Sequence, residues 1–274
     1  MISTAEIHRA AAREGLRFDQ AEKDGMIVLL LSTLAPILES KKDWFFKGGT
    51  CLRHCYFPGY RFSEDIDFTC REEGAGLEQA LLRLRSAASE AADRTGIRFE
   101  CREPRSDPAG VQVEIPVEYS RGGARRQALP AVKVHLTFDE PLLSDPESRI
   151  VRPPDYFDRP VFSLLSYSLV EIVAEKLRAM LQQQEKWPRP RDLYDLWHIL
   201  CFKKERFGRR TLRELFQEKC RVRGLPPDPE RLRSDHLQAW NRAAWRNQLA
   251  PLLKSAPDYD AIWSDWRDVC DTLF

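Results

Sequence analysis

The chain has 274 residues, of which 43% are hydrophobic and 31% charged, and its formal net charge is +1. This length and composition suit one large or two smaller folded cores and give no sign of disorder. The longest apolar run, around residues 26–31, is far shorter than the roughly 20 residues of a membrane span, and the start of the chain lacks a signal pattern. We therefore expect a cytoplasmic protein with no membrane partner. The seven cysteines include no C-x-x-C pair, which argues against a disulfide framework or a zinc knuckle.

The first half of the sequence mixes helix and strand patterns. Ser3 and Glu6 have the spacing of a capping box, and apolar residues recur at helical spacing. The predicted elements are helices at 4–14 and 18–40, a strand at 44–47, a short helix at 50–56, a strand at 64–70, a helix at about 76–95, and strands at 97–102, 111–119 and 131–138. Eleven residues that include Gly122 and Gly123 separate the last two strands, which predicts an antiparallel hairpin.

The second half is predicted to be helical. After a proline-rich junction near residues 145–160, helical patterns cover 166–184, 191–204, 211–222, 234–253 and 258–273. The sequence therefore predicts an α+β fold with two domains, one at 1–150 and a helical one at 151–274.

Two carboxylates separated by one residue mark the stretch KGGTCLRHCYFPGYRFSEDIDF at 47–68. Residues two apart on a strand point to the same face, so Asp65 and Asp67 point together while Ile66 points to the other side. Such a pair suits Mg²⁺, which is often held by a few carboxylates and the phosphates of a nucleotide. Alone, a D-x-D pattern is more often a solvated strand end.

A glycine pair just upstream strengthens the metal and nucleotide interpretation. Gly48 and Gly49 permit a turn without Cβ hindrance, and Thr50 can begin a helix whose free N–H groups would receive a phosphate. The combination of this turn with Asp65 and Asp67 favours a metal-nucleotide site.

The motif blocks KGGTCLRH and RFSEDIDF resemble the first motif of the DNA polymerase β-like nucleotidyltransferases, in the form found in the AbiEii/AbiGii toxin family. The resemblance implies a nucleotidyltransferase core with a mixed sheet, followed by a helical domain that completes the active site. It further implies that Asp65 and Asp67 hold the catalytic metal, and it places the nucleotide near Gly48, Gly49, Thr50 and Ser63.

A second block, VEIVAEKLRAMLQQQEKWPRPRDLYDLWHIL, carries a lysine within an apolar helix stripe. Lys176 there needs either a carboxylate partner or a phosphate ligand, because an unpaired buried ammonium is costly. The segment resembles the family's Glu-Lys-Leu and Arg-Asp-Leu-x-Asp helices, which implies that Lys176 and Arg191 bind the nucleotide and that Asp192 or Asp195 engages the acceptor. Arg191 and Asp195 could equally form an exposed ion pair.

The sequence departs from the family pattern at His135, where the superfamily usually places a third acidic residue. His135 could ligate metal, act as a base near neutral pH, or be a bystander. Glu114, on the preceding strand, is the alternative source of the third carboxylate.

The resemblance implies a nucleotidyltransferase toxin of a type IV toxin-antitoxin system that transfers NMP from an NTP, with Mg²⁺ or alternatively Mn²⁺, and that has a cognate antitoxin. The expected acceptor is RNA, in particular a tRNA 3′ end, which agrees with twelve Lys or Arg against five Asp or Glu between residues 186 and 223. Two alternatives are a nucleotide- or RNA-binding protein that has lost turnover and a transferase that modifies a protein hydroxyl.

Overall fold

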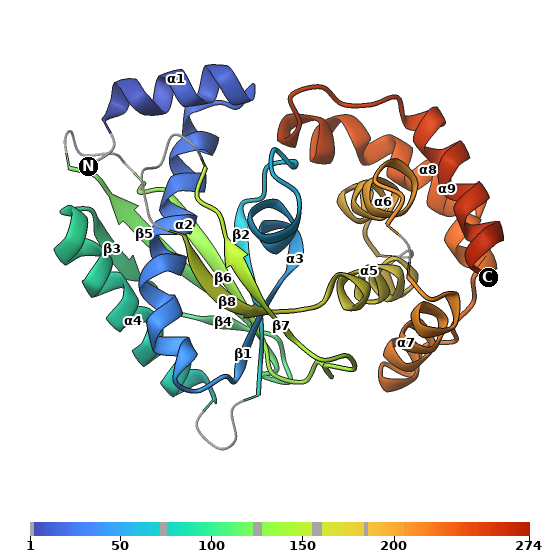
Figure 1. The fold of residues 1–274 in the computed structure, drawn as a ribbon, viewed down its shortest axis with the longest axis horizontal. Helices are drawn as coiled ribbons and strands as arrows, with labels where there is room; N and C mark the ends of the chain where they lie inside the picture. The colour runs from blue at the N-terminus through green and yellow to red at the C-terminus, as the bar shows by residue number, and fades with distance from the viewer. Residues whose placement is uncertain (1–2, 72–75, 123–127, 155–160, 184–185, 206) are drawn as a thin grey trace. The chain divides into compact units, whose positions relative to one another are not determined.

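The computed structural model describes residues 3–71, 76–122, 128–154, 161–183, 186–205 and 207–274. The chain divides into two compact units, coloured along the chain in Figure 1. Unit 1 comprises Met1–Glu140 and Pro146–Tyr167, and unit 2 comprises Pro141–Asp145 and Ser168–Phe274. No described helix combines the length and the apolar character that crossing a membrane requires.

Unit 1 contains a mixed sheet and four helices among its described residues. In chain order its elements are α1 (Thr4–Glu14), α2 (Phe18–Glu39), β1 (Trp44–Lys47), α3 (Gly48–Cys51), the π-helical turn η1 (Leu52–Tyr56), β2 (Asp65–Cys70), α4 (Gly76–Thr95), β3 (Arg98–Cys101), β4 (Arg105–Ser106), β5 (Gln112–Ser120), β6 (Ala131–Thr137), β7 (Glu147–Val151) and β8 (Phe162–Ser166). The strand order is β3-β5-β6-β2-β1-β8-β7, with β4 paired to β5. The pairs β2/β6 and β1/β8 are parallel and the others are antiparallel.

This arrangement confirms the predicted α+β class and the mixed sheet. β5 and β6 pair antiparallel, as the hairpin pattern predicts, while residues 123–127 of their connection, Gly123 included, lie outside the described residues.

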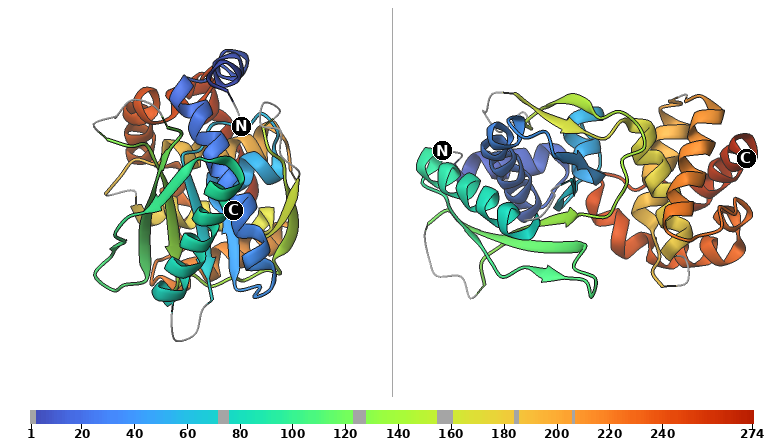
Figure 2. Two further views of the ribbon diagram at one scale, coloured as in Figure 1. Left: turned by 90° about the vertical axis from the view of Figure 1, so that its left-hand side faces the viewer. Right: turned by 90° about the horizontal axis from the view of Figure 1, so that it is seen from below.

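One face of the central strands is apolar and packs beneath α2 and α4, which lie side by side (Figures 1 and 2). The Phe68 ring on β2 contacts the rings of Trp44 and Phe46 on β1, with centroids 5.2 and 5.4 Å away, and Arg83 of α4 lies over Trp44. Side chains alternate along a strand, so β2 turns its aspartates to the other face.

Three strands were not predicted: the two-residue strand β4, and the strands β7 and β8. β7 lies within the predicted junction at about 145–160 and β8 lies just after it, and both extend unit 1 to Tyr167. The dividing point thus lies after β8, whereas the sequence placed it near residue 150. Residues 155–160 of the connection lie outside the described residues.

Unit 2 is helical in its described part. Its elements are α5 (Leu169–Gln183), α6 (Pro190–Trp197), the π-helical turn η2 (His198–Phe202), α7 (Arg209–Val222), the 3₁₀ turn η3 (Glu230–Arg233), α8 (Asp235–Ala244), the π-helical turn η4 (Trp245–Leu249), the 3₁₀ turn η5 (Ala250–Leu252) and α9 (Tyr259–Leu273). The predicted helices at 191–204 and 234–253 are therefore each broken into turns of different pitch.

A buried ion pair joins residues 141–145 to unit 2. Glu171 on α5 accepts hydrogen bonds from the backbone N–H groups of Leu143 and Ser144, at 3.1 and 2.9 Å. Lys219 on α7 is fully buried, lies 2.8 Å from the Glu171 carboxylate and donates to the Pro141 carbonyl. These bonds satisfy a buried charge pair and explain why a segment between two parts of unit 1 belongs to unit 2.

Candidate active site

Asp65 and Asp67 lie on β2, with their side chains on the face opposite the apolar one. Ile66 and Phe68 between and beside them are fully buried, while both aspartates are half-buried. The shared face predicted for the two carboxylates is therefore present.

The glycine turn after β1 packs directly against Asp67. Lys47, the last residue of β1, pairs with Asp67 in the sheet register, which brings Gly48 beside that carboxylate. Gly48 has a φ of +79°, and a Cβ added to it would lie 2.1 Å from Asp67 Oδ2. Only glycine fits there, both for its backbone conformation and for the space that Asp67 fills.

Gly49 provides a second close approach. A Cβ added to Gly49 would lie 2.8 Å from Ser63 Oγ, so the turn brings Gly48, Gly49, Ser63 and Asp67 together. The hydroxyl of Thr50 is buried and donates to the Asp65 backbone carbonyl, which ties α3 to β2. The roles of these residues in nucleotide binding stay predictions.

His135 lies between two carboxylates. It is the register partner of Asp67 on β2 and of Glu114 on β5. Its Nδ1 is 3.3 Å from Asp67 Oδ1, and its Nε2 is 3.3 Å from Glu114 Oε2. Glu114 also accepts a hydrogen bond from Lys133 at 3.0 Å. Glu114, the candidate for the third acid, is therefore a direct neighbour of His135, which occupies the position where the superfamily usually has an acid.

Burial alone would lower the pKa of His135, but the hydrogen bond and charge of Asp67, the charge of Asp65 and the hydrogen bond of Glu114 raise it to about 9. A raised pKa favours the protonated imidazole, whose positive charge offsets the neighbouring carboxylates. A role as base or metal ligand requires loss of that proton.

The pH dependence of stability tests this charge state. Because the pKa in the folded protein exceeds the ordinary value of 6.5, the stability contributed by His135 is complete below about pH 6.5 and is lost as the pH rises through about 9. We expect a His135→Gln variant in EDTA to unfold at lower urea concentration than wild type near pH 6, and at nearly the same concentration near pH 10. An equal difference at both pH values would contradict the assignment.

The donor set on β2 fits a hard divalent cation. Mg²⁺ is usually held by one or two carboxylates and completed by substrate phosphates and water, so a larger protein cluster is not needed. Among the residues that the structure describes, no group of three or more His, Cys, Asp or Glu side chains has metal-site geometry. Asp65 and Asp67 could hold such an ion, and their role as metal ligands stays a prediction.

In unit 2, Lys176 is the centre of a buried ion-pair cluster. Its Nζ lies 2.7 Å from Asp192 Oδ1 and 2.7 Å from Asp195 Oδ2, and Arg189 Nε lies 2.5 Å from Asp192 Oδ2. Burial alone would raise the pKa of Asp192, but the charges of Arg189 and Lys176 lower it well below its usual range. Arg191 donates to the Gln248 carbonyl at 3.2 Å. The structure thus brings together three residues predicted to be catalytic, and it gives Lys176 the carboxylate partners that the sequence left open.

Removing Lys176 should destabilise the fold, because Asp195 is fully buried and Asp192 nearly so. We expect Lys176→Met to lower the free energy of unfolding by about 3–5 kcal/mol, as when one partner of a buried ion pair is lost. Urea denaturation measures this, with the exposed Lys203→Met as the control expected to stay near wild type. A loss below about 1 kcal/mol for Lys176→Met would show that these ion pairs contribute little to the fold.

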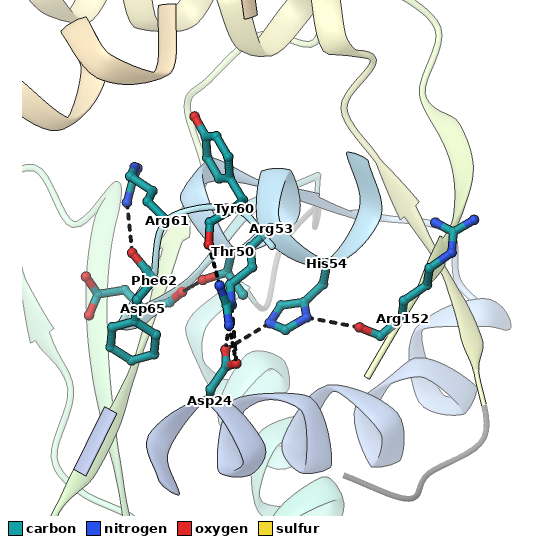
Figure 3. Close-up of polar contacts among 9 residues, drawn as sticks. All are labelled: Asp24, Thr50, Arg53, His54, Tyr60, Arg61, Phe62, Asp65 and Arg152. Atoms are coloured by element: carbon teal, nitrogen blue, oxygen red, sulfur yellow. Dashed lines mark hydrogen bonds and ion pairs between the residues drawn. The ribbon is translucent and has the colours of Figure 1, made fainter. Parts of the chain in front are cut away.

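Sequence reasoning gave no role to a second buried cluster, shown in Figure 3. Asp24 of α2 is fully buried, accepts from Arg53 at 2.8 Å and lies 3.1 Å from His54 Nε2. Burial alone would raise the pKa of Asp24, but Arg53 and His54 lower it well below its usual range. Arg53 also donates to the Tyr60 carbonyl. The available signal was a charged residue, Asp24, two positions before the apolar run at 26–31.

Comparison with known proteins identifies the family. A model described as nucleotidyl transferase AbiEii toxin, type IV toxin-antitoxin system, matches residues 29–271. The chain therefore belongs to the AbiEii nucleotidyltransferase toxin family, and it is an enzyme of the nucleotidyltransferase class. Membership of a type IV system implies an antitoxin partner and an NTP substrate.

Solved structures share this fold. One is MenT4, the nucleotidyltransferase toxin Rv2826c from Mycobacterium tuberculosis H37Rv, with 20% identity and a TM-score of 0.65, covering 100% of this chain and 90% of MenT4. Another is JHP933 from Helicobacter pylori, with 19% identity and a TM-score of 0.60, covering 94% of this chain and 93% of JHP933. No curated protein matches the sequence.

Proposed function

We propose that this toxin transfers a nucleoside monophosphate from an NTP to an RNA hydroxyl, with a tRNA 3′ end as the acceptor and Mg²⁺ as the metal. The observation that carries the proposal is the pair Asp65 and Asp67 on one strand face, packed against the Gly48 turn. NTP and tRNA are cytoplasmic, so we propose that the toxin acts there.

In this proposal Asp65 and Asp67 hold the cation, which would neutralise phosphate charge as the bond to the leaving pyrophosphate breaks. Ser63 and the backbone N–H groups after Gly48 donate to phosphate oxygens. The predicted contact of Asp192 or Asp195 with the acceptor hydroxyl requires one of these carboxylates to leave its buried ion pair with Lys176. Catalysis then rests mainly on positioning and on charge neutralisation.

The basic stretch at 186–223 gives partial support for an RNA acceptor. Several of its cations are already paired, including Arg189 with Asp192, Arg210 with Glu214 and Lys219 with Glu171. Asp192 and Glu214 are themselves among the acidic residues of this stretch, so of these three pairs only Lys219 with Glu171 lowers its excess positive charge.

The test is incubation of the purified protein with each labelled NTP, Mg²⁺ and either total tRNA or total cell protein. We expect label on tRNA, from one NTP more than the others, and no label when EDTA is added. Label on protein alone would show that the acceptor is a protein and not RNA. Nucleotide binding without transfer to either would favour the binding protein that has lost turnover.

The same assay addresses the third acid. If Glu114 supplies it, Glu114→Gln should lose most of the transfer while His135→Ala loses little. The opposite pattern would assign the role to His135, and the 3.3 Å contact between the two makes both variants necessary.

A further inference from the structure

Arg61 is a buried cation beside the glycine turn, and neither the motif nor the preceding sections give it a role. Its residue is 5% exposed. A Cβ added to Gly49 would lie 2.8 Å from Arg61 Nη2, the same distance as from Ser63 Oγ. Because Gly49 has no side chain, the Arg61 guanidinium and the Ser63 hydroxyl can both lie close to its backbone.

The segment that carries Arg61 is held in place from both sides. Arg61 Nη1 donates to the Phe62 carbonyl at 3.2 Å, and its guanidinium lies over the Tyr60 ring at 5.8 Å (Figure 3). The Tyr60 carbonyl in turn accepts from Arg53, which the buried Asp24 fixes. A guanidinium restrained in this way loses little conformational entropy when it binds a ligand.

Two side chains of opposite charge pack against neighbouring glycines of the turn. Asp67 packs against Gly48, and Arg61 packs against Gly49. Consecutive Cα atoms are about 3.8 Å apart, so a phosphate chain attached to a cation at Asp67 is within reach of Arg61. Planar guanidinium groups bind phosphate oxygens by two parallel hydrogen bonds, which a lysine ammonium does not.

We propose that Arg61 is a triphosphate-binding residue, whose guanidinium donates to the phosphate oxygens of the NTP alongside Ser63. This inference rests on the proposed function, since it names the part of the substrate that the Gly49 side of the turn recognises. The proposal assigns recognition of the triphosphate to Arg61, a residue of unit 1. Lys176 of unit 2, which the family resemblance implies binds the nucleotide, lies 2.7 Å from each of two carboxylates.

The experiment measures binding of inorganic tripolyphosphate with Mg²⁺ by calorimetry, for wild type, Arg61→Met and Arg61→Lys. We expect Arg61→Met to weaken binding by about 10- to 100-fold, the usual range for a hydrogen bond to a charged group. Arg61→Lys should recover only part of the loss. The matched control is Arg71→Met, which removes an exposed arginine that also lies over an aromatic ring, at the far end of β2; it should bind like wild type.

Circular dichroism establishes that each variant is folded. If Arg61→Met does not fold, Arg61→Lys decides the question: weakened binding supports the proposal, and wild-type binding overturns it. Wild-type affinity in both variants, or no binding to the wild-type protein, also overturns it. Failure of labelled NTP transfer with Arg61-dependent tripolyphosphate binding would instead reject the proposed reaction and retain the phosphate site.

Discussion

Replacement of Asp67 by asparagine should reduce nucleotidyl transfer by at least about a thousandfold while the protein stays folded. Asparagine keeps the volume of the side chain and its packing against Gly48, but it removes the charge that holds a divalent cation. The side chain of Asp67 is 28% exposed and so lies outside the buried core, and we therefore expect the fold to tolerate the loss of its charge. Transfer of labelled NTP measures the loss, and thermal unfolding measures the fold.

The control for Asp67→Asn is Asp107→Asn, which removes a carboxylate from a turn of the same unit, where it accepts from the N–H groups of Val111 and Gln112. That variant should keep the wild-type rate of transfer. Unchanged turnover in folded Asp67→Asn protein would reject the metal assignment, whatever the acceptor proves to be.

Alanine at Gly48 should reduce transfer by about a hundredfold, because its Cβ would occupy the position of the Asp67 carboxylate. Either Asp67 rotates away or β1 moves away from β2, and both displace the proposed metal ligand. The left-handed φ of +79° adds a strain of roughly 1–2 kcal/mol to the folded state.

Gly110 separates these two effects. It has a φ of +71°, and nothing lies within 4 Å of a Cβ added there. Gly110→Ala should therefore lose a comparable amount of stability from strain alone and keep its activity. If Gly48→Ala were no less active than Gly110→Ala, the close packing of Asp67 against the turn would not matter for catalysis.

Much of the site could be predicted from the sequence, because its main features follow from local periodicity. The alternation of β2 places Asp65 and Asp67 on one face, and the hairpin of β5 and β6 places Glu114 opposite His135. The capping box of Ser3 and Glu6 is likewise present at the start of α1. Each feature depends on residues close in sequence, or on strands joined by a short connection, so few alternative arrangements compete.

The sequence failed where a short segment has no periodic signal of its own. β7 and β8 are five residues each and pair with one another, while β8 also extends the sheet at β1. Their strand character depends on those partners more than on their own composition, as is usual for short strands.

Which charges neutralise one another was decided only by the tertiary structure. The sequence shows that Lys176 lies in an apolar stripe, and it leaves both a carboxylate and a phosphate as partners; the fold places Asp192 and Asp195 at 2.7 Å. Asp24 and Arg53 are 29 residues apart, and Asp67 and His135 meet through the parallel pairing of β2 with β6. Periodicity determines the side of a helix or strand on which a residue lies, whereas the partner of a buried charge depends on how distant elements pack.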